Sequence, residues 1–279
     1  MDARRASSEL GGGGAVSEAG RGDVLAGRRA VVTGAGRGIG RAVAEQLAAA
    51  GAAVVLAART EGEIDAVAAE LRARGSDAVA VRCDITEDGS VAELVDQSRR
   101  ALGGPIDTLV NNAGVYRPRA FLDYTLDDWR WMLDVNVVAM VRVTAAFLPE
   151  LLAQPRARII NVSSIAGKKG TYGQAAYNAS KHAQIGLTRC LALETGTTGL
   201  RVNAVCPGFT KTDLIDLDEL GRAHGKPGGD VWSTVEQAAT IKRTVTLDEI
   251  AAAVVYLASP AADGVNGQSL VVDGGIVMS

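Results

Sequence analysis

Short apolar runs alternate with helical stretches along most of this chain, and this alternation constrains the fold more than any other feature of the sequence. The seven runs that we interpret as strands are Ala30–Thr33, Ala53–Ala57, Ala78–Arg82, Thr108–Val110, Arg158–Val162, Arg201–Val205 and Ser269–Val272. The stretches that we interpret as helices are Gly38–Ala50, Ile64–Arg74, Ser90–Leu102, Asp127–Leu152, Tyr177–Glu194 and Leu247–Ala258. Because the runs are almost continuously apolar, both faces of each strand must be covered. The pattern therefore predicts an α/β fold with three layers, doubly wound around a seven-stranded parallel sheet.

The alternation begins at Arg28 and continues without a linker to the C-terminus. We therefore predict a single domain over residues 28–279 and a flexible tail over residues 1–27, which is rich in glycine, serine and charge. Residues 209–246 form an unusually long connection after the sixth run, with several clustered glycines. Connections of this length are usually functional, so we interpret this one as a lid over the ligand crevice.

The composition excludes several classes of protein. The 29 basic and 32 acidic side chains give a net charge of −3, which lacks the basic balance of a nucleic-acid-binding protein. No uninterrupted apolar run reaches the ~18 residues needed to span a bilayer, and no secretory signal is evident near the N-terminus. Cys83, Cys190 and Cys206 are widely spaced, which predicts buried structural thiols, no metal site and a cytoplasmic location.

A glycine-rich turn lies between the first predicted strand and the first predicted helix. It reads Thr33-Gly34-Ala35-Gly36-Arg37-Gly38-Ile39-Gly40 and has the spacing T-G-x-x-x-G-x-G. Glycines allow the backbone to approach a pyrophosphate closely, and the helix N-terminus offers free N–H groups to the negative charge. This strand–turn–helix setting predicts a dinucleotide site in a Rossmann-like fold.

Two arginines indicate which dinucleotide is bound. A ribose 2′-hydroxyl is usually held by an acidic residue at the end of the second strand, but Arg59 stands there in this sequence. Arg37 lies in the glycine-rich turn. Guanidinium groups match the oxygens of a 2′-phosphate, so NADP(H) is favoured over NAD(H) as the cofactor.

A tyrosine and a lysine lie four residues apart in the fifth predicted helix. Tyr177 and Lys181 therefore share one helix face, where an ammonium group lowers the pKa of a nearby phenol. Ser164 follows the fifth predicted strand and places a hydroxyl where it can hold a substrate oxygen beside that phenol. Together the three residues predict proton transfer to or from a substrate oxygen.

These motifs resemble those of the short-chain dehydrogenase/reductase family, in its single-domain type. The resemblance runs from about residue 28 to the C-terminus and includes Thr33–Gly40, Asn111-Asn112-Ala113-Gly114, Ser164, Tyr177, Lys181 and Pro207-Gly208. It implies that Tyr177 is the proton donor in carbonyl reduction, that Lys181 lowers its pKa, and that Ser164 orients the carbonyl oxygen. It also implies that Asn136 supports a proton-relay water.

The resemblance further implies a set of cofactor-binding residues. Asp84 matches a residue near the adenine and Thr212 one that holds the carboxamide. Asn111 matches a residue that lines the inner ribose edge through its loop. The whole predicted set, apart from Asn111, is Gly34, Gly36, Arg37, Gly38, Ile39, Gly40, Arg59, Asp84, Ile85, Asn112, Ala113, Gly114, Tyr177, Lys181, Pro207, Gly208, Thr210 and Thr212.

The sequence indicates the type of reaction more clearly than it indicates the substrate. Residues 167–170, 179–182 and 203–209 resemble those of 3-oxoacyl-thioester and aromatic-polyketide ketoreductases, which implies a small-molecule or thioester-linked ketone. Residues 195–199 lack the arginine by which fatty-acid ketoreductases bind acyl carrier protein, and residues 115–118 lack the extra glycines of the polyketide enzymes. The pocket is expected to draw on Tyr116, Tyr172, Phe209, Leu214 and Trp232. His224 is expected to be exposed to solvent.

Three functions remain open on this reading. The first is an NADPH-dependent ketoreductase of secondary metabolism or acyl-thioester reduction. The second is an NAD-dependent secondary-alcohol dehydrogenase, and the third is a catalytically silent scaffold that senses the dinucleotide. The resemblance also implies a homotetramer, in which the helices over residues 127–152 and 177–194 pair across two-fold axes and residues 264–279 meet a neighbour.

Overall fold

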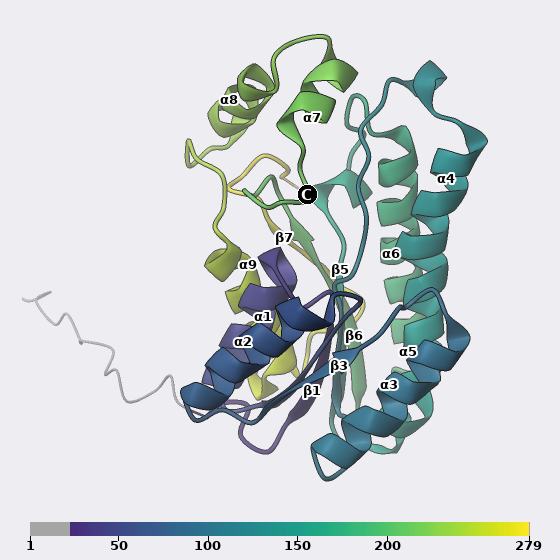
Figure 1. Cartoon of the computed structure of the whole chain (residues 1–279), viewed down its shortest axis with the longest axis vertical. Coiled ribbons are helices and arrows are strands. Elements are labelled where there is room, and N and C mark those ends of the chain that lie inside the picture. Colours follow the sequence, from purple (N-terminus) through teal and green to yellow (C-terminus); the bar gives the residue numbers. More distant parts are fainter. Residues whose placement is uncertain (1–22, 279) are drawn as a thin grey trace, which may run out of the picture.

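The computed structural model describes residues Asp23–Met278. Seven parallel strands form one sheet in the order β3-β2-β1-β4-β5-β6-β7 (Figure 1). Their bounds are β1 (Arg29–Thr33), β2 (Ala53–Ala58), β3 (Ala78–Arg82), β4 (Thr108–Asn111), β5 (Ala157–Val162), β6 (Leu200–Pro207) and β7 (Ser269–Val272). Every predicted run is therefore a strand, and the predicted α/β class and sheet are confirmed.

The strand order reverses direction next to β1. The chain first builds outward from β1 through β2 to β3, then returns to add β4 on the other side of β1. Val31 of β1 is paired with Val55 of β2 and with Leu109 of β4, and all three side chains are buried. Ligands of doubly wound sheets bind at the carboxyl ends of the strands where such a reversal occurs.

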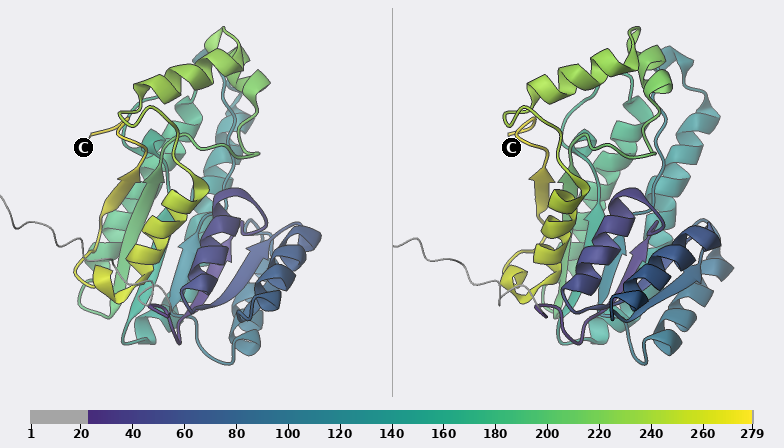
Figure 2. Two further views of the ribbon diagram at one scale, coloured as in Figure 1. Left: turned by 90° about the vertical axis from the view of Figure 1, so that its left-hand side faces the viewer. Right: turned by 60° about the vertical axis from the view of Figure 1, so that its left-hand side comes forward.

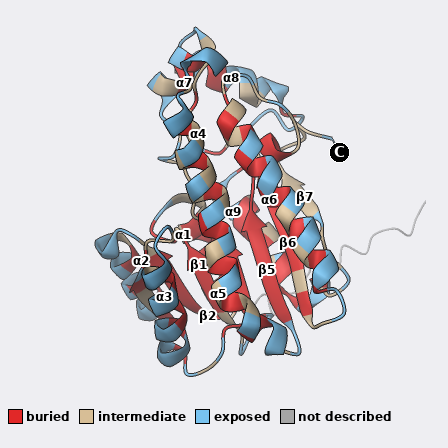
Figure 3. Ribbon diagram, turned by 90° about the vertical axis from the view of Figure 1, so that its right-hand side faces the viewer, coloured by how far each residue is buried: buried red, intermediate tan, exposed pale blue. Residues whose placement is uncertain are grey.

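Helices cover both faces of the sheet and make the three predicted layers (Figures 1 and 2). One face is covered by α1 (Gly38–Ala49), α2 (Glu61–Ala73) and α9 (Leu247–Ala258). The other is covered by α3 (Asp88–Ala101), α5 (Ala139–Ala153) and α6 (Ala175–Glu194). Buried residues lie in the strands and on the helix faces that point toward them (Figure 3). Leu47 of α1 and Phe147 of α5 are fully buried, and each such side chain contributes about 1.5–3 kcal/mol.

The predicted helix over residues 127–152 is interrupted. It consists of α4 (Leu126–Leu133), a π-helical segment at Asp134–Val138, and α5. Thr125 and Asp128 form a reciprocal capping box that begins α4. π-helical turns are rare and often occur at functional sites, and this one contains the fully buried Asn136.

The same helical run, Leu126–Ala153, is long and apolar enough to cross a membrane by length and composition. Its mean hydropathy reaches 1.6, and 44% of the most apolar stretch is buried inside the protein. A core helix of a soluble protein passes the same test. Here α5 contributes Val143, Phe147 and Leu151 to the core beneath the sheet, which accounts for its apolar composition.

The predicted lid over residues 209–246 is not a simple loop. It contains α7 (Leu217–His224) and α8 (Gly228–Ala238), which lie above the carboxyl ends of the strands (Figure 2). Asp216 caps α7 by accepting hydrogen bonds from the N–H groups of Asp218 and Glu219, and Gly225 ends it in the left-handed conformation. The clustered glycines that predicted a loop are therefore partly helix-ending residues.

One boundary and the burial of one cysteine differ from the predictions. Leu25 is only 1% exposed, and its N–H donates to the carbonyl of Ala50 at 2.8 Å, so the packed chain begins before residue 28. The rest of the predicted tail, residues 1–22, lies outside the described residues. Cys83 and Cys206 are buried as predicted, but Cys190 is exposed because it lies on the outer face of α6.

The turn between β1 and α1 is closed by glycines. Gly34 has a φ of +66°, and a Cβ atom on it would lie 2.9 Å from the Cα of Ala113. A Cβ atom on Gly40 would lie 2.2 Å from the carbonyl oxygen of Gly34 and 2.4 Å from the side-chain nitrogen of Asn112. The first turn of α1 therefore packs directly against the end of β1, and only glycine fits between them.

We expect Gly40→Ala to lower the free energy of unfolding by about 1–3 kcal/mol, because the backbone of Gly34 must move to admit a methyl group. Gly62→Ala is the matched control, since a Cβ atom there meets nothing within 4 Å. The control should keep or slightly raise stability, because alanine is the better helix former. Urea denaturation followed by circular dichroism measures both, and equal stability of the two variants would contradict the packing argument.

Candidate active site

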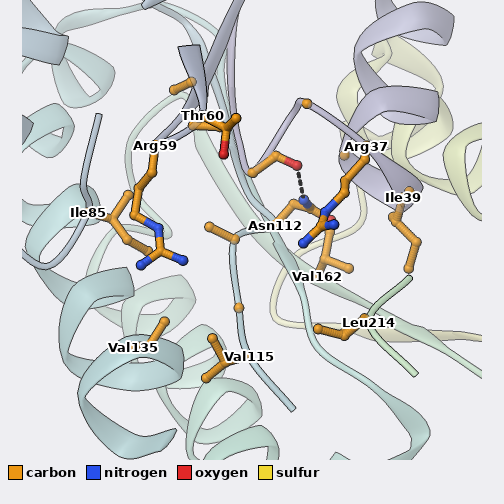
Figure 4. A pocket seen from close by; sticks show the side chains of 18 of the residues that line it. Arg37, Ile39, Arg59, Thr60, Ile85, Asn112, Val115, Val135, Val162 and Leu214 are labelled. Carbon is orange, nitrogen blue, oxygen red and sulfur yellow. Dashed lines mark hydrogen bonds between the residues drawn. The ribbon is translucent and has the colours of Figure 1, made fainter. Parts of the chain in front are cut away.

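A cavity of about 250 Å³ opens at the carboxyl end of the sheet, where the strand order reverses. Almost all of the predicted cofactor-binding residues line it (Figure 4). These are Gly34, Gly36, Arg37, Gly38, Ile39, Gly40, Arg59, Asp84, Ile85, Asn112, Ala113, Gly114, Tyr177, Lys181 and Thr212. The other three, Pro207, Gly208 and Thr210, line a smaller cavity beside it.

The N-terminus of α1 faces the larger cavity. Arg37 is its N-cap residue, has extended backbone and makes no side-chain capping bond, and no acidic side chain occupies the first turn. The first N–H groups of the helix are therefore free of a competing carboxylate, and the positive end of the helix dipole lies at the cavity wall. This end of the cavity suits a pyrophosphate.

Two arginine side chains reach the cavity from separate elements (Figure 4). Arg59 follows β2, and Arg37 belongs to the glycine-rich turn. The only ion pair of Arg37 among the described residues is a long one, 3.9 Å to the exposed Asp213. Thr60 and Glu63 also line this end of the cavity, although sequence reasoning did not select them. Their position within four residues after Arg59 was the available signal.

Hydrogen bonds join the glycine-rich turn to the loop after β4. The hydroxyl of Thr33 donates to the carbonyl of Val110 at 3.3 Å and accepts from the N–H groups of Asn112 at 3.0 Å and Ala113 at 3.1 Å. The side-chain amide of Asn112 donates to the carbonyls of Thr33 at 2.9 Å and Gly34 at 3.2 Å. These bonds hold the two walls of the cavity together.

The Asn111 side chain does not line either cavity. It is buried, and its amide donates to the hydroxyl of Thr144 at 3.0 Å and to the side-chain oxygen of Asn161 at 2.9 Å. Successive residues of a strand point to opposite faces, which turns Asn111 toward α5 and leaves Asn112 at the cavity. The role of Asn111 in this structure is to join β4, β5 and α5.

Tyr177, Lys181 and Ser164 meet where the two cavities adjoin. Tyr177 lies in the first turns of α6 and lines both cavities, Lys181 lines the larger one, and Ser164 lines the smaller one. The amino nitrogen of Lys181 is 5.6 Å from the centre of the Tyr177 ring. Its hydrogen bonds go to the carbonyl of Val162 at 3.1 Å and to the side-chain oxygen of Gln184 at 3.0 Å.

Burial is the main cause of the pKa shifts of Tyr177 and Lys181. It raises the pKa of Tyr177 to about 12, although the Ser164 hydroxyl beside it acts in the opposite direction. Burial also lowers the pKa of Lys181 to about 8. The sequence predicted that the Lys181 ammonium lowers the pKa of the phenol. The ammonium is instead directed at Val162 and Gln184. Because burial raises the pKa of Tyr177, the phenol keeps its proton at neutral pH.

Asn136 is connected to Lys181 indirectly, through other side chains. Its side-chain oxygen accepts from the N–H of Val115 at 2.8 Å, and its amide donates to the carbonyl of Val115 at 3.0 Å and to the hydroxyl of Ser180 at 3.0 Å. Its own carbonyl accepts from the amide of Gln184 at 2.6 Å. Gln184, three residues after Lys181 on the same face of α6, thus links Lys181 to Asn136. Helical spacing was the signal that could have identified it.

The smaller cavity, of about 90 Å³, lies on the other side of Tyr177. Tyr116, Phe209 and Leu214 line it as predicted. Trp232 does not line it but packs edge-on against Phe209, with ring centres 6.1 Å apart. Tyr116 packs edge-on against the ring of Tyr177 itself, with centres 4.9 Å apart.

Two residues of this region differ from the predictions made for them. Tyr172 is 69% exposed and does not line either cavity. His224 was expected to be exposed, but it is half-buried against Tyr172, with ring centres 5.4 Å apart. Its ring also bonds the carbonyl of Leu220 within α7 at 2.9 Å. Neither residue reaches Tyr177.

Known proteins share these features. Residues 28–219 match the family model described as short chain dehydrogenase. The short-chain reductase protein NovJ of Streptomyces niveus is 40% identical over 88% of this chain and 92% of its own length. A 3-oxoacyl-[acyl-carrier-protein] reductase of Synechocystis is 38% identical over 89% of this chain and 96% of its own length.

Solved structures agree in fold. A variant of actinorhodin polyketide ketoreductase, determined with NADPH, has a TM-score of 0.85 and 34% identity, covering 89% of this chain and 97% of that one. A short chain dehydrogenase of Burkholderia cenocepacia, determined with NADP, has a TM-score of 0.81 and 34% identity, covering 91% of this chain and 99% of that one. The chain therefore belongs to the short-chain dehydrogenase family of oxidoreductases, enzymes that act on CH–OH and C=O groups.

Proposed function

We propose that this protein is an NADPH-dependent ketoreductase that reduces a carbonyl group to a secondary alcohol. The observation that carries the proposal is the position of Tyr177, whose ring forms part of the wall of both cavities. One cavity has the glycines, helix N-terminus and arginines that suit a dinucleotide. The other is small and mostly apolar, as a ketone site should be.

The residues around the larger cavity suit NADPH. The N–H groups of α1 would hold the pyrophosphate, and Arg37 and Arg59 would bind the 2′-phosphate. The bound dinucleotide would supply a hydride to the carbonyl carbon. Pro207, Gly208, Thr210 and Thr212 would adjoin its nicotinamide end. The NADPH and NADP present in the two solved relatives support this cofactor.

The protein's own residues would handle the proton. Ser164 would donate a hydrogen bond to the substrate carbonyl oxygen and orient it toward Tyr177. The Tyr177 phenol, protonated at neutral pH, would then give its proton to that oxygen as the C–O bond becomes single. The Lys181 ammonium would stabilise the phenolate that results, and Asn136 and Gln184 would hold Lys181 in place.

Oxidation of a secondary alcohol with NAD is the second candidate. Two relatives are named dehydrogenases, the meso-2,3-butanediol enzyme of Serratia marcescens at 36% identity and the cis-4-hydroxycyclohexanecarboxylate enzyme of Sinomonas cyclohexanicum at 39%. The absence of an acidic residue directly after β2, where Arg59 stands, favours NADP(H) instead. A catalytically silent scaffold ranks last, because Ser164, Tyr177 and Lys181 are all present.

A homotetramer, a cytoplasmic location and a role in secondary metabolism remain predictions. Exposed apolar side chains support the expected assembly: Val138 and Val141 lie in the run Leu126–Ala153, and Leu193 lies on α6. Such side chains gain from being covered by another copy of the chain.

Replacing Tyr177 tests the proposed chemistry. Tyr177→Phe should lower kcat for ketone reduction by roughly a factor of 10²–10⁴, because it removes the proton donor and keeps the ring. Tyr172→Phe is the matched control, since that phenol is exposed and lines neither cavity, and it should leave kcat unchanged. NADPH oxidation followed by absorbance measures both variants. Full activity of Tyr177→Phe on a panel of 3-oxo and cyclic ketones would refute the assignment.

The arginines test the choice of cofactor. Arg59→Ala and Arg37→Ala should each weaken NADPH binding by about tenfold to a hundredfold and leave NADH binding nearly unchanged, because only NADPH carries the 2′-phosphate. Arg82→Ala, an exposed arginine that does not line the cavity, is the control. Fluorescence titration gives the dissociation constants. An equal loss of affinity for both nucleotides would show that the arginines do not read the phosphate.

The pH profile tests the role of Lys181. Its pKa of about 8 means that it is charged below that pH and neutral above it. Reduction requires the charged form to stabilise the Tyr177 phenolate, so kcat/KM should be level near neutrality and fall as the pH rises through about 8. Lys181→Arg keeps the charge at high pH and should remove the decline from whatever activity it retains. A wild-type profile that stays level well above that pH would contradict this role.

A further inference from the structure

The smaller cavity holds more hydrogen-bonding groups than a simple ketone can use. Most of its wall is apolar, including Ile165, Phe209 and Leu214. Besides Ser164 and Tyr177, however, six polar residues line it: Tyr116, Ser163, Thr171, Gln174, Thr210 and Thr212. Three of these, Tyr116, Gln174 and Thr210, come from three different parts of the fold. The proposed function assigns no role to the side chains of Tyr116 and Gln174.

Gln174 lies directly in front of α6, three residues before Tyr177. It is 3% exposed and occupies the N-cap position, but its side chain makes no capping bond. Only its carbonyl serves the helix, by accepting from the N–H of Asn178 at 2.7 Å. N-cap side chains usually satisfy helix N–H groups, so this amide is left to serve the cavity.

Two hydroxyl groups accompany that amide. The Tyr116 and Thr210 hydroxyl oxygens are both buried, and neither has a hydrogen-bond partner within Asp23–Met278. Thr210 as a whole is 5% exposed. Buried hydroxyls without a partner are uncommon in proteins, because they lose their hydration and gain nothing in return. A ligand oxygen in the cavity would remove that cost.

Tyr116 is held firmly from both sides. The backbone of the preceding residue, Val115, is clamped by both side-chain atoms of Asn136 at 2.8 and 3.0 Å. The following residue, Arg117, donates to the carboxylate of Asp128 at 2.6 Å. Burial raises the pKa of the Tyr116 phenol, so it stays protonated and available as a donor. A group fixed in this way discriminates between ligands better than a mobile one.

The reacting carbonyl cannot satisfy these groups. In the proposed mechanism its oxygen has two lone pairs, and Ser164 and Tyr177 already occupy them. We propose that Gln174, Tyr116 and Thr210 form a subsite for a second oxygen of the substrate. The preferred substrate is then a ketone that carries another carbonyl or a hydroxyl group close to the carbonyl that is reduced. This inference rests on the proposed function and deepens it.

The test compares two ketones of the same length, acetylacetone, which has a second oxygen, and methyl propyl ketone, which does not. The wild-type enzyme should favour acetylacetone in kcat/KM. Gln174→Met and Tyr116→Phe keep the bulk of the side chain and should each reduce that preference by about tenfold or more. Activity on methyl propyl ketone should fall much less than activity on acetylacetone, whereas a general folding defect would lower both equally.

Two controls separate this inference from the proposed function. Tyr172→Phe removes an exposed phenol and should not alter the preference. Tyr177→Phe should abolish reduction of both ketones; if it does not, the proposed function fails. If the wild-type enzyme reduces neither ketone, calorimetry on the NADPH complex measures the same preference as a ratio of dissociation constants. An equal preference in the wild type, Gln174→Met and Tyr116→Phe proteins overturns the subsite.

Discussion

The parallel pairing of β1 with β4 is the constraint on which the rest of the site depends. It brings together two segments that are about eighty residues apart, the glycine-rich turn after β1 and the loop after β4. Thr33 and Asn112 then tie these segments to each other through hydrogen bonds at the cavity wall. Because parallel strands end at the same edge, the residues that follow β2, β5 and β6 arrive at this crevice as well.

A second constraint is the burial of Lys181. An ammonium group that is removed from water must be hydrogen-bonded, and here the carbonyl of Val162 and the side chain of Gln184 provide the partners. Gln184 in turn donates to the carbonyl of Asn136, in the π-helical segment. From this irregular turn in the long helical run, Asn136 bonds both α6 and the loop that carries Tyr116.

The two cavities meet at Tyr177, and their walls differ in chemistry. The larger one is surrounded by backbone N–H groups and arginines, and the smaller one by apolar side chains with a few unpaired polar groups. The segment over residues 209–246 contributes to both, since Leu214 lines each of them. This double contact supports the predicted lid over residues 209–246.

Much of this could be predicted from sequence because the signals are local. Apolar runs, the spacing of the glycines and the four-residue separation of Tyr177 and Lys181 depend only on neighbouring residues, and these gave the sheet, the helices and most of the residues of the larger cavity. Arg59 could also be located, because its role depends on its place at the end of a strand.

Other features depend on contacts between distant segments, and the sequence carries no local sign of them. Whether Asn111 faces the cavity or the core, whether Cys190 is buried and whether Tyr172 reaches Tyr177 all depend on which neighbour packs against each side chain. The polar groups of the smaller cavity belong to this class too, because Tyr116, Gln174 and Thr210 come together only through the packing of three separate loops. Local pattern thus determined the framework and the residues of the proposed chemistry, whereas tertiary packing decided the surroundings of each side chain and with them the shape and polarity of the smaller cavity.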